Sequence, residues 1–244
     1  MRKALLLALI VFLGAVSPSG AACVDPATLT RSAVSITRTF DDNEQDAPAG
    51  LRGVRGTGWF LSPTSMVTVE HVTAGMKLSR QSWKPIDIRT GTDKQSIAVR
   101  IRHVAGQGAE KIAVLELQTA FPGAQGLQLR MQPLTPEEPV VSLAYPESRL
   151  RVVGGRFVKY GDGDKFAGTA LLELYDGDDR LVLDHGSSGA PVLDCTGRVV
   201  AVVSNLFTTT MQFMSRVIRI STAWGSPNVV CVPIPVLEEL ASVE

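Results

Sequence analysis

The chain has 244 residues, 45% of them hydrophobic, and this is enough to bury a sizeable core. Its 24 basic residues balance its 24 acidic residues, so the formal net charge is zero. Because the charges balance, the composition gives no electrostatic reason to expect nucleic acid or another polyanion as the partner.

The first residues have the order of a cleavable signal peptide. Arg2 and Lys3 give a positive start, residues 4–16 form an apolar run, and residues 20–22 are small. The apolar run is shorter than a membrane span needs. We therefore predict that residues 1–22 are removed and that the mature chain is periplasmic or secreted, with no membrane span. A retained anchor is the alternative.

The three cysteines are Cys23, Cys195 and Cys231. Export permits a disulfide. We predict the pair Cys195–Cys231, because both residues lie beside predicted strands of the second half, with Cys23–Cys231 as the second choice; either pair leaves one thiol over. Acylation of Cys23 as a lipoprotein is disfavoured, because Gly20 replaces the aliphatic residue that is usual three positions earlier. The cysteines and histidines show no metal-ligand spacing, so we predict no metal and no other cofactor.

Alternating apolar residues predict a first set of strands. Val34 and Ile36, for example, alternate with polar neighbours. The predicted strands are residues 30–40, 56–62, 65–72, 86–90, 96–104 and 112–117. Residues 41–53 are acidic and contain proline and glycine, which indicates a solvated loop. We assign this set to a domain of residues 23–125.

Residues 122–139 are rich in proline, glycine and glutamine and connect this set to a second one. The predicted strands of the second set are residues 139–144, 151–160, 169–175, 181–184, 190–193, 198–204 and 228–234. Residues 207–227 are longer than a hairpin needs, and they either flank a substrate cleft or pack on the sheet. Pro235 begins a short predicted helix, residues 236–243, because proline suits the first helical position. The second domain comprises residues 126–244.

The most informative stretch is residues 184–191, Asp-His-Gly-Ser-Ser-Gly-Ala-Pro. Gly186 and Gly189 permit backbone angles that side chains forbid, and they let a reacting carbonyl approach main-chain N–H groups. The stretch therefore predicts a tight turn that presents the hydroxyl of Ser188. An ordinary hairpin loop rich in glycine and serine is the alternative.

A serine nucleophile needs a base that takes its proton. The three histidines, His71, His103 and His185, all precede Ser188. An α/β-hydrolase requires its histidine after the serine and a Gly-x-Ser-x-Gly elbow, but Ala190 stands at the second glycine position. The order of the residues therefore excludes that fold.

Two segments resemble the trypsin-like serine peptidases, particularly the bacterial kinds related to the HtrA and glutamyl endopeptidase groups. The glycine-containing strand at residues 56–62, followed by Val-Glu-His-Val at residues 69–72, is similar to their histidine segment. Residues 186–192 are similar to their Gly-x-Ser-Gly-x-Pro-Val turn. The resemblance implies an all-β protein with two six-stranded antiparallel β-barrels of chymotrypsin type, at residues 32–119 and 139–234, and a cleft between them.

The resemblance also implies a serine endopeptidase that acts on polypeptides. Ser188 would attack the scissile carbonyl, and His71 would act first as general base and then as acid to the leaving amine. The N–H groups of Gly186 and Ser188 would hold the oxyanion.

The same resemblance suggests where a substrate binds. Ser204, Asn205 and Leu206 form the edge that would pair with an extended peptide as an added strand. Leu206 stands where relatives often have glycine, and it would narrow the first specificity pocket. Val182 falls near the floor of that pocket, where an apolar side chain disfavours a preference for basic residues.

One position departs from the family pattern. The family has an aspartate directly before the apolar strand that corresponds to residues 112–115, but this chain has Lys111 there and Glu110 one place earlier. In the template triad, replacing that aspartate with its amide costs about 10⁴-fold in turnover. Glu110 would serve as the third residue if the strand bulges; otherwise a water or a backbone carbonyl orients His71.

We therefore predict an exported serine endopeptidase whose activity is reduced or uncertain because of Lys111. The first alternative is a weak or inactive module on the same fold that binds extended peptides. A more distant alternative is an esterase or another acyl transferase.

Overall fold

The computed structural model describes residues 23–41, 44, 51–91, 93–106, 111–162, 167–175, 185–206, 208–213, 216–221 and 227–232. Several sequence predictions therefore lie outside the described residues. They are the signal peptide at residues 1–22, the strand at residues 181–184, the helix at residues 236–243, and the individual residues Glu110 and Val182.

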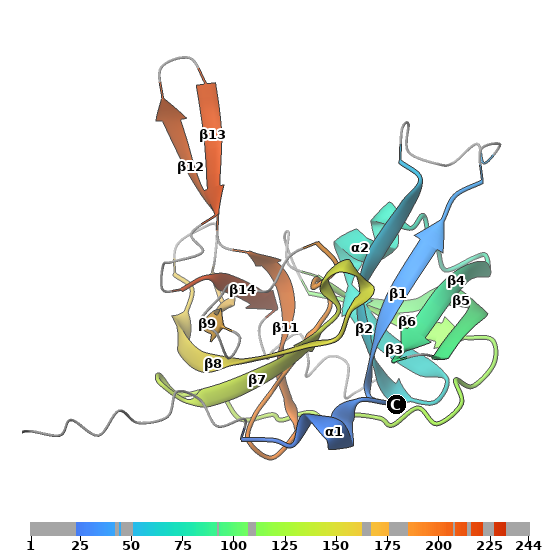
Figure 1. Cartoon of the computed structure of the whole chain (residues 1–244), viewed down its shortest axis with the longest axis horizontal. Coiled ribbons are helices and arrows are strands. Elements are labelled where there is room, and N and C mark those ends of the chain that lie inside the picture. Colours follow the sequence, from blue (N-terminus) through green and yellow to red (C-terminus); the bar gives the residue numbers. More distant parts are fainter. Residues whose placement is uncertain are drawn as a thin grey trace, which may run out of the picture.

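The strands form two closed, six-stranded antiparallel barrels that lie beside each other (Figure 1). The first contains β1 (Ala33–Thr39), β2 (Gly53–Ser62), β3 (Ser65–Val69), β4 (Lys84–Thr90), β5 (Asp93–Ala105) and β6 (Ile112–Leu117), in the order β1-β2-β3-β6-β5-β4. The second contains β7 (Pro139–Ala144), β8 (Arg151–Tyr160), β9 (Ala170–Tyr175), β10 (Pro191–Leu193), β11 (Val199–Leu206) and β14 (Val229–Val232), in the order β10-β11-β14-β9-β8-β7. The predicted all-β fold with two six-stranded barrels is confirmed.

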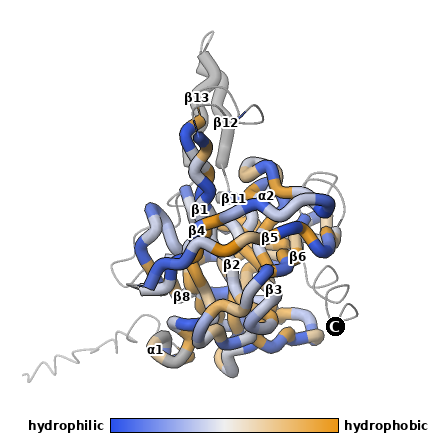
Figure 2. The backbone as a smooth tube through the Cα atoms, turned by 90° about the vertical axis from the view of Figure 1, so that its right-hand side faces the viewer, coloured by the Kyte–Doolittle hydropathy of each residue, from blue (hydrophilic) through white to orange (hydrophobic). Residues whose placement is uncertain are grey.

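Alternation and irregular pairing explain why these strands close. In β1, Val34 and Ile36 are fully buried in the core of the first barrel. Figure 2 shows the corresponding change between hydrophobic and hydrophilic residues along the strands. The register shifts by one residue between Ile101 and His103 of β5 and between Phe157 and Lys159 of β8. Such bulges bend a strand and increase its twist, as a small barrel requires.

Short helical elements and one separate hairpin lie outside the barrels. The helix α1 (Pro26–Leu29) is capped by Asp25, which accepts a hydrogen bond from the N–H of Ala27 at 2.9 Å. The single turn η1 (Pro146–Ser148) follows β7. The strands β12 (Thr208–Phe213) and β13 (Arg216–Ser221) pair only with each other and join neither barrel (Figure 1).

The predicted strand at residues 65–72 ends earlier than expected. It stops at Val69, and the helix α2 (Glu70–Gly75) follows directly. The N–H of Glu70 still donates to the β6 side of the ladder, but the hydroxyl of Thr73 then donates to the carbonyl oxygen of Glu70 at 2.8 Å and closes a helical turn. His71 therefore lies on a helix and is exposed, whereas Val72 is buried.

Both predicted cysteine pairings are wrong. Cys23 and Cys195 form the disulfide, with their Cα atoms 4.7 Å apart. Cys231 is a thiol that is buried in the core of the second barrel, while Cys195 is exposed in the turn after β10. Since two cysteines can bond only when their Cβ atoms face each other at short range, the inward position of Cys231 excludes it from pairing with Cys195. No helix among the described residues is both long and apolar enough to cross a membrane.

Candidate active site

The two barrels meet at Thr57, a buried residue of β2. Its N–H donates to the carbonyl oxygen of Ser188 at 2.9 Å. Its hydroxyl donates to the carbonyl oxygen of Gly186 at 2.7 Å and accepts from the N–H of Tyr145 at 3.0 Å. One threonine of the first barrel therefore fixes both the turn that contains Ser188 and the segment that follows β7.

The turn itself requires its glycines. Gly186 and Gly189 have φ of 106° and 93°, a region that side chains rarely adopt. A Cβ atom at Gly189 would lie 2.1 Å from the carbonyl oxygen of Thr57 and 2.3 Å from the hydroxyl oxygen of Thr68. The close approach of this turn to β2 and β3 is therefore possible only without a side chain.

The hydroxyl of Ser188 and two backbone donors lie together in this turn. The side chain of Ser188 is half-buried, and its hydroxyl donates to the carbonyl oxygen of Ser204 at 3.1 Å. Within the described part of the chain, the N–H groups of Gly186 and Ser188 donate to no protein acceptor. The turn thus contains a serine hydroxyl and two backbone N–H groups that form no backbone hydrogen bond with the described residues.

The helix α2, which contains His71, packs against the same strand β2. A Cβ atom at Gly56 would lie 2.8 Å from Cγ1 of Val72 and 3.2 Å from the carbonyl oxygen of Ser188. The residue after His71 and the backbone of Ser188 therefore contact the same glycine of β2. The helix that contains His71 and the turn that contains Ser188 therefore both adjoin β2 at this glycine.

Lys111 lies directly next to this helix. Its carbonyl oxygen accepts a hydrogen bond from the N–H of Glu70 at 2.9 Å, in continuation of the pair Val69↔Ile112. Its side chain is half-buried and forms no ion pair with a carboxylate of the described residues. A residue with a cationic side chain thus occupies the position directly next to the His71 helix.

The strand β11 supplies the other side of the site. Its register against β14 shifts between Val203 and Asn205, so that Ser204 is the extra residue of a bulge. The side chain of Ser204 is buried, and its hydroxyl oxygen is 3.3 Å from the amide nitrogen of Asn205. The bulge directs the carbonyl of Ser204 toward Ser188. Leu206 ends the strand.

Two hydroxyl residues were missed by the sequence analysis. Thr57 holds the turn, and Thr68 of β3 donates to the carbonyl oxygen of Thr57 at 2.8 Å. Both side chains are fully buried. A threonine at an inward position of a predicted strand needs a hydrogen-bond partner, and this was the available signal. The described residues contain no group of three or more potential metal ligands.

The comparison with known families now agrees with this geometry. The sequence profile of the trypsin-like peptidase domain matches residues 56–202, more than half of the 244 residues. The matched region includes Gly56, the helix α2 and the Ser188 turn. The chain therefore belongs to the trypsin-like peptidase family, and its class is that of the trypsin-like serine proteases. No curated protein matches the chain in sequence.

Solved structures share the fold. The crystal structure of Rv3671c from M. tuberculosis H37Rv, a mutant in its inactive form, has a TM-score of 0.60 and 18% identity, covering 93% of this chain and 94% of that chain. The active form of Rv3671c protease also has a TM-score of 0.60 and 18% identity, with coverage of 89% and 82%. Deg5 has a TM-score of 0.56 and 15% identity, with coverage of 86% and 87%. At these identities, the likeness shows the fold alone.

Proposed function

We propose that this chain is an exported serine endopeptidase that hydrolyses peptide bonds through Ser188 and His71. The observation that carries the proposal is the packing at Gly56, where the turn of Ser188 and the helix of His71 contact one residue of β2. An acyl-transfer site needs a nucleophile, a base and oxyanion donors in one place. The hydroxyl, the imidazole and the two backbone N–H groups supply these three parts.

The proposed reaction starts with a rotation about the Cα–Cβ bond of Ser188, which takes its hydroxyl from the carbonyl of Ser204 toward His71. His71 accepts the proton while the serine oxygen attacks the scissile carbonyl. The N–H groups of Gly186 and Ser188 stabilise the resulting oxyanion. His71 then gives the proton to the leaving amine, and a water molecule hydrolyses the acyl-enzyme by the same steps in reverse.

The third residue of the site departs from the family pattern. A carboxylate beside the base fixes its tautomer and stabilises the imidazolium that forms. Lys111 cannot do this, because its ammonium repels a second positive charge. We propose Glu110 as the atypical third residue, and we expect the activity to be lower than that of a peptidase with an aspartate.

Polypeptides are the proposed substrates. The residues before the scissile bond would pair with the edge at Ser204, Asn205 and Leu206. The bulge at Ser204 supports this, because it turns backbone groups away from β14 and toward the nucleophile. Val182 would line the first specificity pocket and favour apolar side chains there.

We propose that the mature chain is exported to the periplasm or to the outside of the cell. Residues 1–22 have the order of a signal peptide, and the Cys23–Cys195 disulfide is typical of an oxidising compartment. The same disulfide occupies the thiol of Cys23, so that this thiol is not available for a lipid. The mature chain is thus proposed to begin near Cys23 without a lipid anchor.

The test is hydrolysis of unstructured casein by the mature chain, with Ser188→Ala as the matched control. We expect cleavage by the wild type and none by the variant. Equal cleavage by both proteins would identify a contaminating peptidase, and no cleavage by either would overturn the proposed endopeptidase.

A peptide-binding module is the second candidate, because Lys111 has a cationic side chain where the family has an aspartate. This candidate predicts that the wild type binds unstructured peptides but cleaves neither peptides nor nitrophenyl esters. Cleavage of the esters alone would indicate the third candidate, an esterase or acyl transferase.

A further inference from the structure

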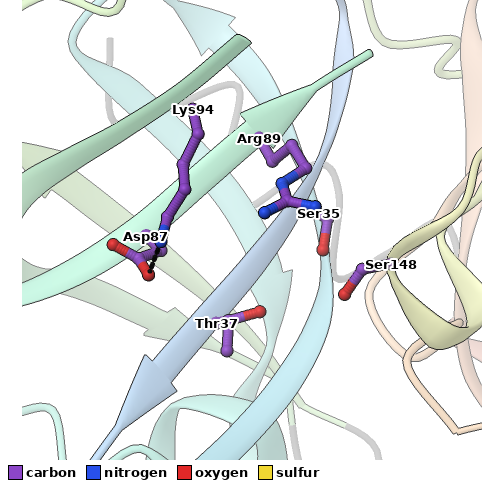
Figure 3. A pocket seen from close by; sticks show the side chains of 6 residues that line it. All are labelled: Ser35, Thr37, Asp87, Arg89, Lys94 and Ser148. Atoms are coloured by element: carbon purple, nitrogen blue, oxygen red, sulfur yellow. Dashed lines mark ion pairs between the residues drawn. The ribbon is translucent and has the colours of Figure 1, made fainter. Parts of the chain in front are cut away.

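A hollow of about 200 Å³ lies on the outer face of the first barrel, at its contact with the second half of the chain (Figure 3). The residues that line it are Ser35, Thr37, Asp87, Arg89, Lys94 and Ser148. Figure 3 shows the guanidinium of Arg89 reaching across β1 toward Ser35, with Ser148 approaching from the opposite wall. Neither the sequence pattern nor the site at Ser188 accounts for this hollow.

The strand register connects the hollow to Thr57. Ser35 of β1 pairs with Thr57 of β2 on one side and with Arg89 of β4 on the other, and Arg89 pairs with Lys94 of β5. Residues directly opposite each other in antiparallel strands project from the same face of the sheet. One row of side chains therefore runs from the threonine that holds the Ser188 turn into the hollow.

The opposite wall has the same connection. Ser148 ends η1, and the preceding residue, Glu147, donates its N–H to the carbonyl oxygen of His185 at 3.2 Å. A Cβ atom at Gly186 would lie 2.8 Å from the carbonyl oxygen of Tyr145 and 3.6 Å from Cδ of Arg55. The turn that contains Gly186 and the hollow therefore both contact the same short segment, residues 145–148.

The charges in the hollow favour an anion. Lys94 pairs with Asp87 at 2.7 Å (Figure 3), but Arg89 forms no ion pair with any described residue. Arg55, which is exposed between the hollow and Gly186, also lacks a described carboxylate partner. Three hydroxyl groups complete the lining. A guanidinium with neighbouring hydroxyl donors matches a carboxylate, which accepts several hydrogen bonds in one plane.

The position of the hollow determines which part of a substrate reaches it. Ser188 lies between Ser204 of β11 and Thr57 of β2, and the proposed acyl-side residues bind at β11. The hollow extends from Thr57 in the other direction. Arg89 of β4 lies two strand spacings from β2, about 10 Å, and an extended peptide covers this distance with about three residues.

We propose that this hollow is a carboxylate subsite, which binds an acidic side chain or the terminal carboxylate of the substrate about three residues after the cleaved bond. The proposal rests on the proposed function for its direction along the substrate. Arg89 is the main ligand, and the hydroxyls of Ser35, Thr37 and Ser148 add donors. Arg55 adds positive charge along the path from Gly186.

The first experiment digests a peptide library and aligns the products at the cleaved bond. We expect aspartate and glutamate to be enriched on the order of fivefold at one of the second to fourth positions after the bond, as for a half-exposed ion pair. Arg89→Glu should abolish the enrichment, Arg89→Lys should keep part of it, and Lys159→Glu on β8 is the charge-matched control that should keep all of it. The absence of enrichment in the wild type would overturn the subsite while leaving the endopeptidase intact.

The second experiment does not require catalysis. Fluorescence anisotropy with the Ser188→Ala protein compares peptide pairs that differ only in aspartate against asparagine, or in a free against an amidated C-terminus. Tighter binding of the charged member, lost in Arg89→Glu and weakened by salt, supports the subsite even if hydrolysis fails. A preference for internal aspartate identifies a side chain as the ligand, and a preference for the free terminus identifies the terminal carboxylate. Equal binding of both members of each pair would sink the proposal.

Discussion

The turn at residues 186–190 and Lys111, the residue directly before β6, both lie near the His71 helix, yet they differ in how strongly the fold constrains them. The turn is fixed by positive φ angles at Gly186 and Gly189 and by hydrogen bonds from Thr57. Lys111 needs only its backbone carbonyl to complete the ladder to Glu70. Packing therefore determines the Ser188 turn, whereas the backbone hydrogen bond of Lys111 leaves its side chain unconstrained.

The largest expected effect comes from changing that side chain. Lys111→Asp replaces an ammonium by a carboxylate beside the His71 helix and should raise kcat/KM for peptides by about 10²- to 10⁴-fold. The measurement is initial-rate hydrolysis of an unstructured peptide, with Lys159→Asp as the control for a distant charge change. An unchanged rate would mean that another group already orients His71, and Glu110→Gln should then lower the activity.

The next largest effect comes from the disulfide that joins Cys23, which precedes the first barrel, to Cys195 of the second barrel. Cys23→Ser removes a crosslink between residues 172 apart in sequence, and should lower the free energy of unfolding by about 4 kcal/mol. Urea denaturation of the oxidised protein measures this loss. Reduction should abolish the difference from wild type, and an oxidised variant as stable as wild type would contradict the pairing.

Gly189→Ala tests how tightly the turn is specified. Its Cβ would overlap Thr57 and Thr68 at a positive φ, so we expect a loss of about 3 kcal/mol in unfolding free energy. Gly197→Ala is the matched control, because Gly197 also has a positive φ of 81° but no atom lies within 4 Å of its added Cβ. Its loss should be about 1 kcal/mol. Equal losses would show that the turn is not closely packed on β2.

The smallest expected effect is a loss of unfolding free energy at low pH. Burial raises the pKa of Asp194, but hydrogen bonds from the hydroxyl and N–H of Thr196 and from Arg198 outweigh it and hold the pKa below its ordinary value. The stabilisation is therefore complete above the unfolded-state pKa, about 3.9, and is lost as the pH falls through the folded-state pKa.

Urea unfolding of wild type and Asp194→Asn between pH 7 and pH 2 measures this effect. The difference between the two proteins should shrink as the pH falls, and Asp162→Asn serves as the exposed control. A constant difference down to pH 2 would contradict the lowered pKa.

Much of the fold was predictable because its signals are local. The ends of β6, β7 and β8 coincide with the predicted strands, since alternation and flanking turn residues define them. The helix at His71 and the Cys23–Cys195 pair were not predicted, because both depend on contacts between distant segments. The cysteine pairing in particular requires knowledge of which strand face points inward.

The candidate site likewise has some features that were predictable from the sequence and some that were not. The glycine and serine pattern singled out Ser188 and Gly186, and the resemblance of residues 56–72 to the family's histidine segment singled out His71. The carbonyl of Ser204 beside Ser188 and the bridging role of Thr57 arise from a bulge and from a contact between barrels. The hollow at Arg89 arises from the register of four strands, which no short motif encodes.

The most direct measurement of the central claim is labelling of the folded, mature protein by a fluorophosphonate, with the modified residue mapped by mass spectrometry. If His71 activates Ser188, the probe should attach to Ser188 in the wild type and at a strongly reduced rate in His71→Ala. No labelling of the wild type, or equal labelling of both proteins, would contradict an active site built from these two residues.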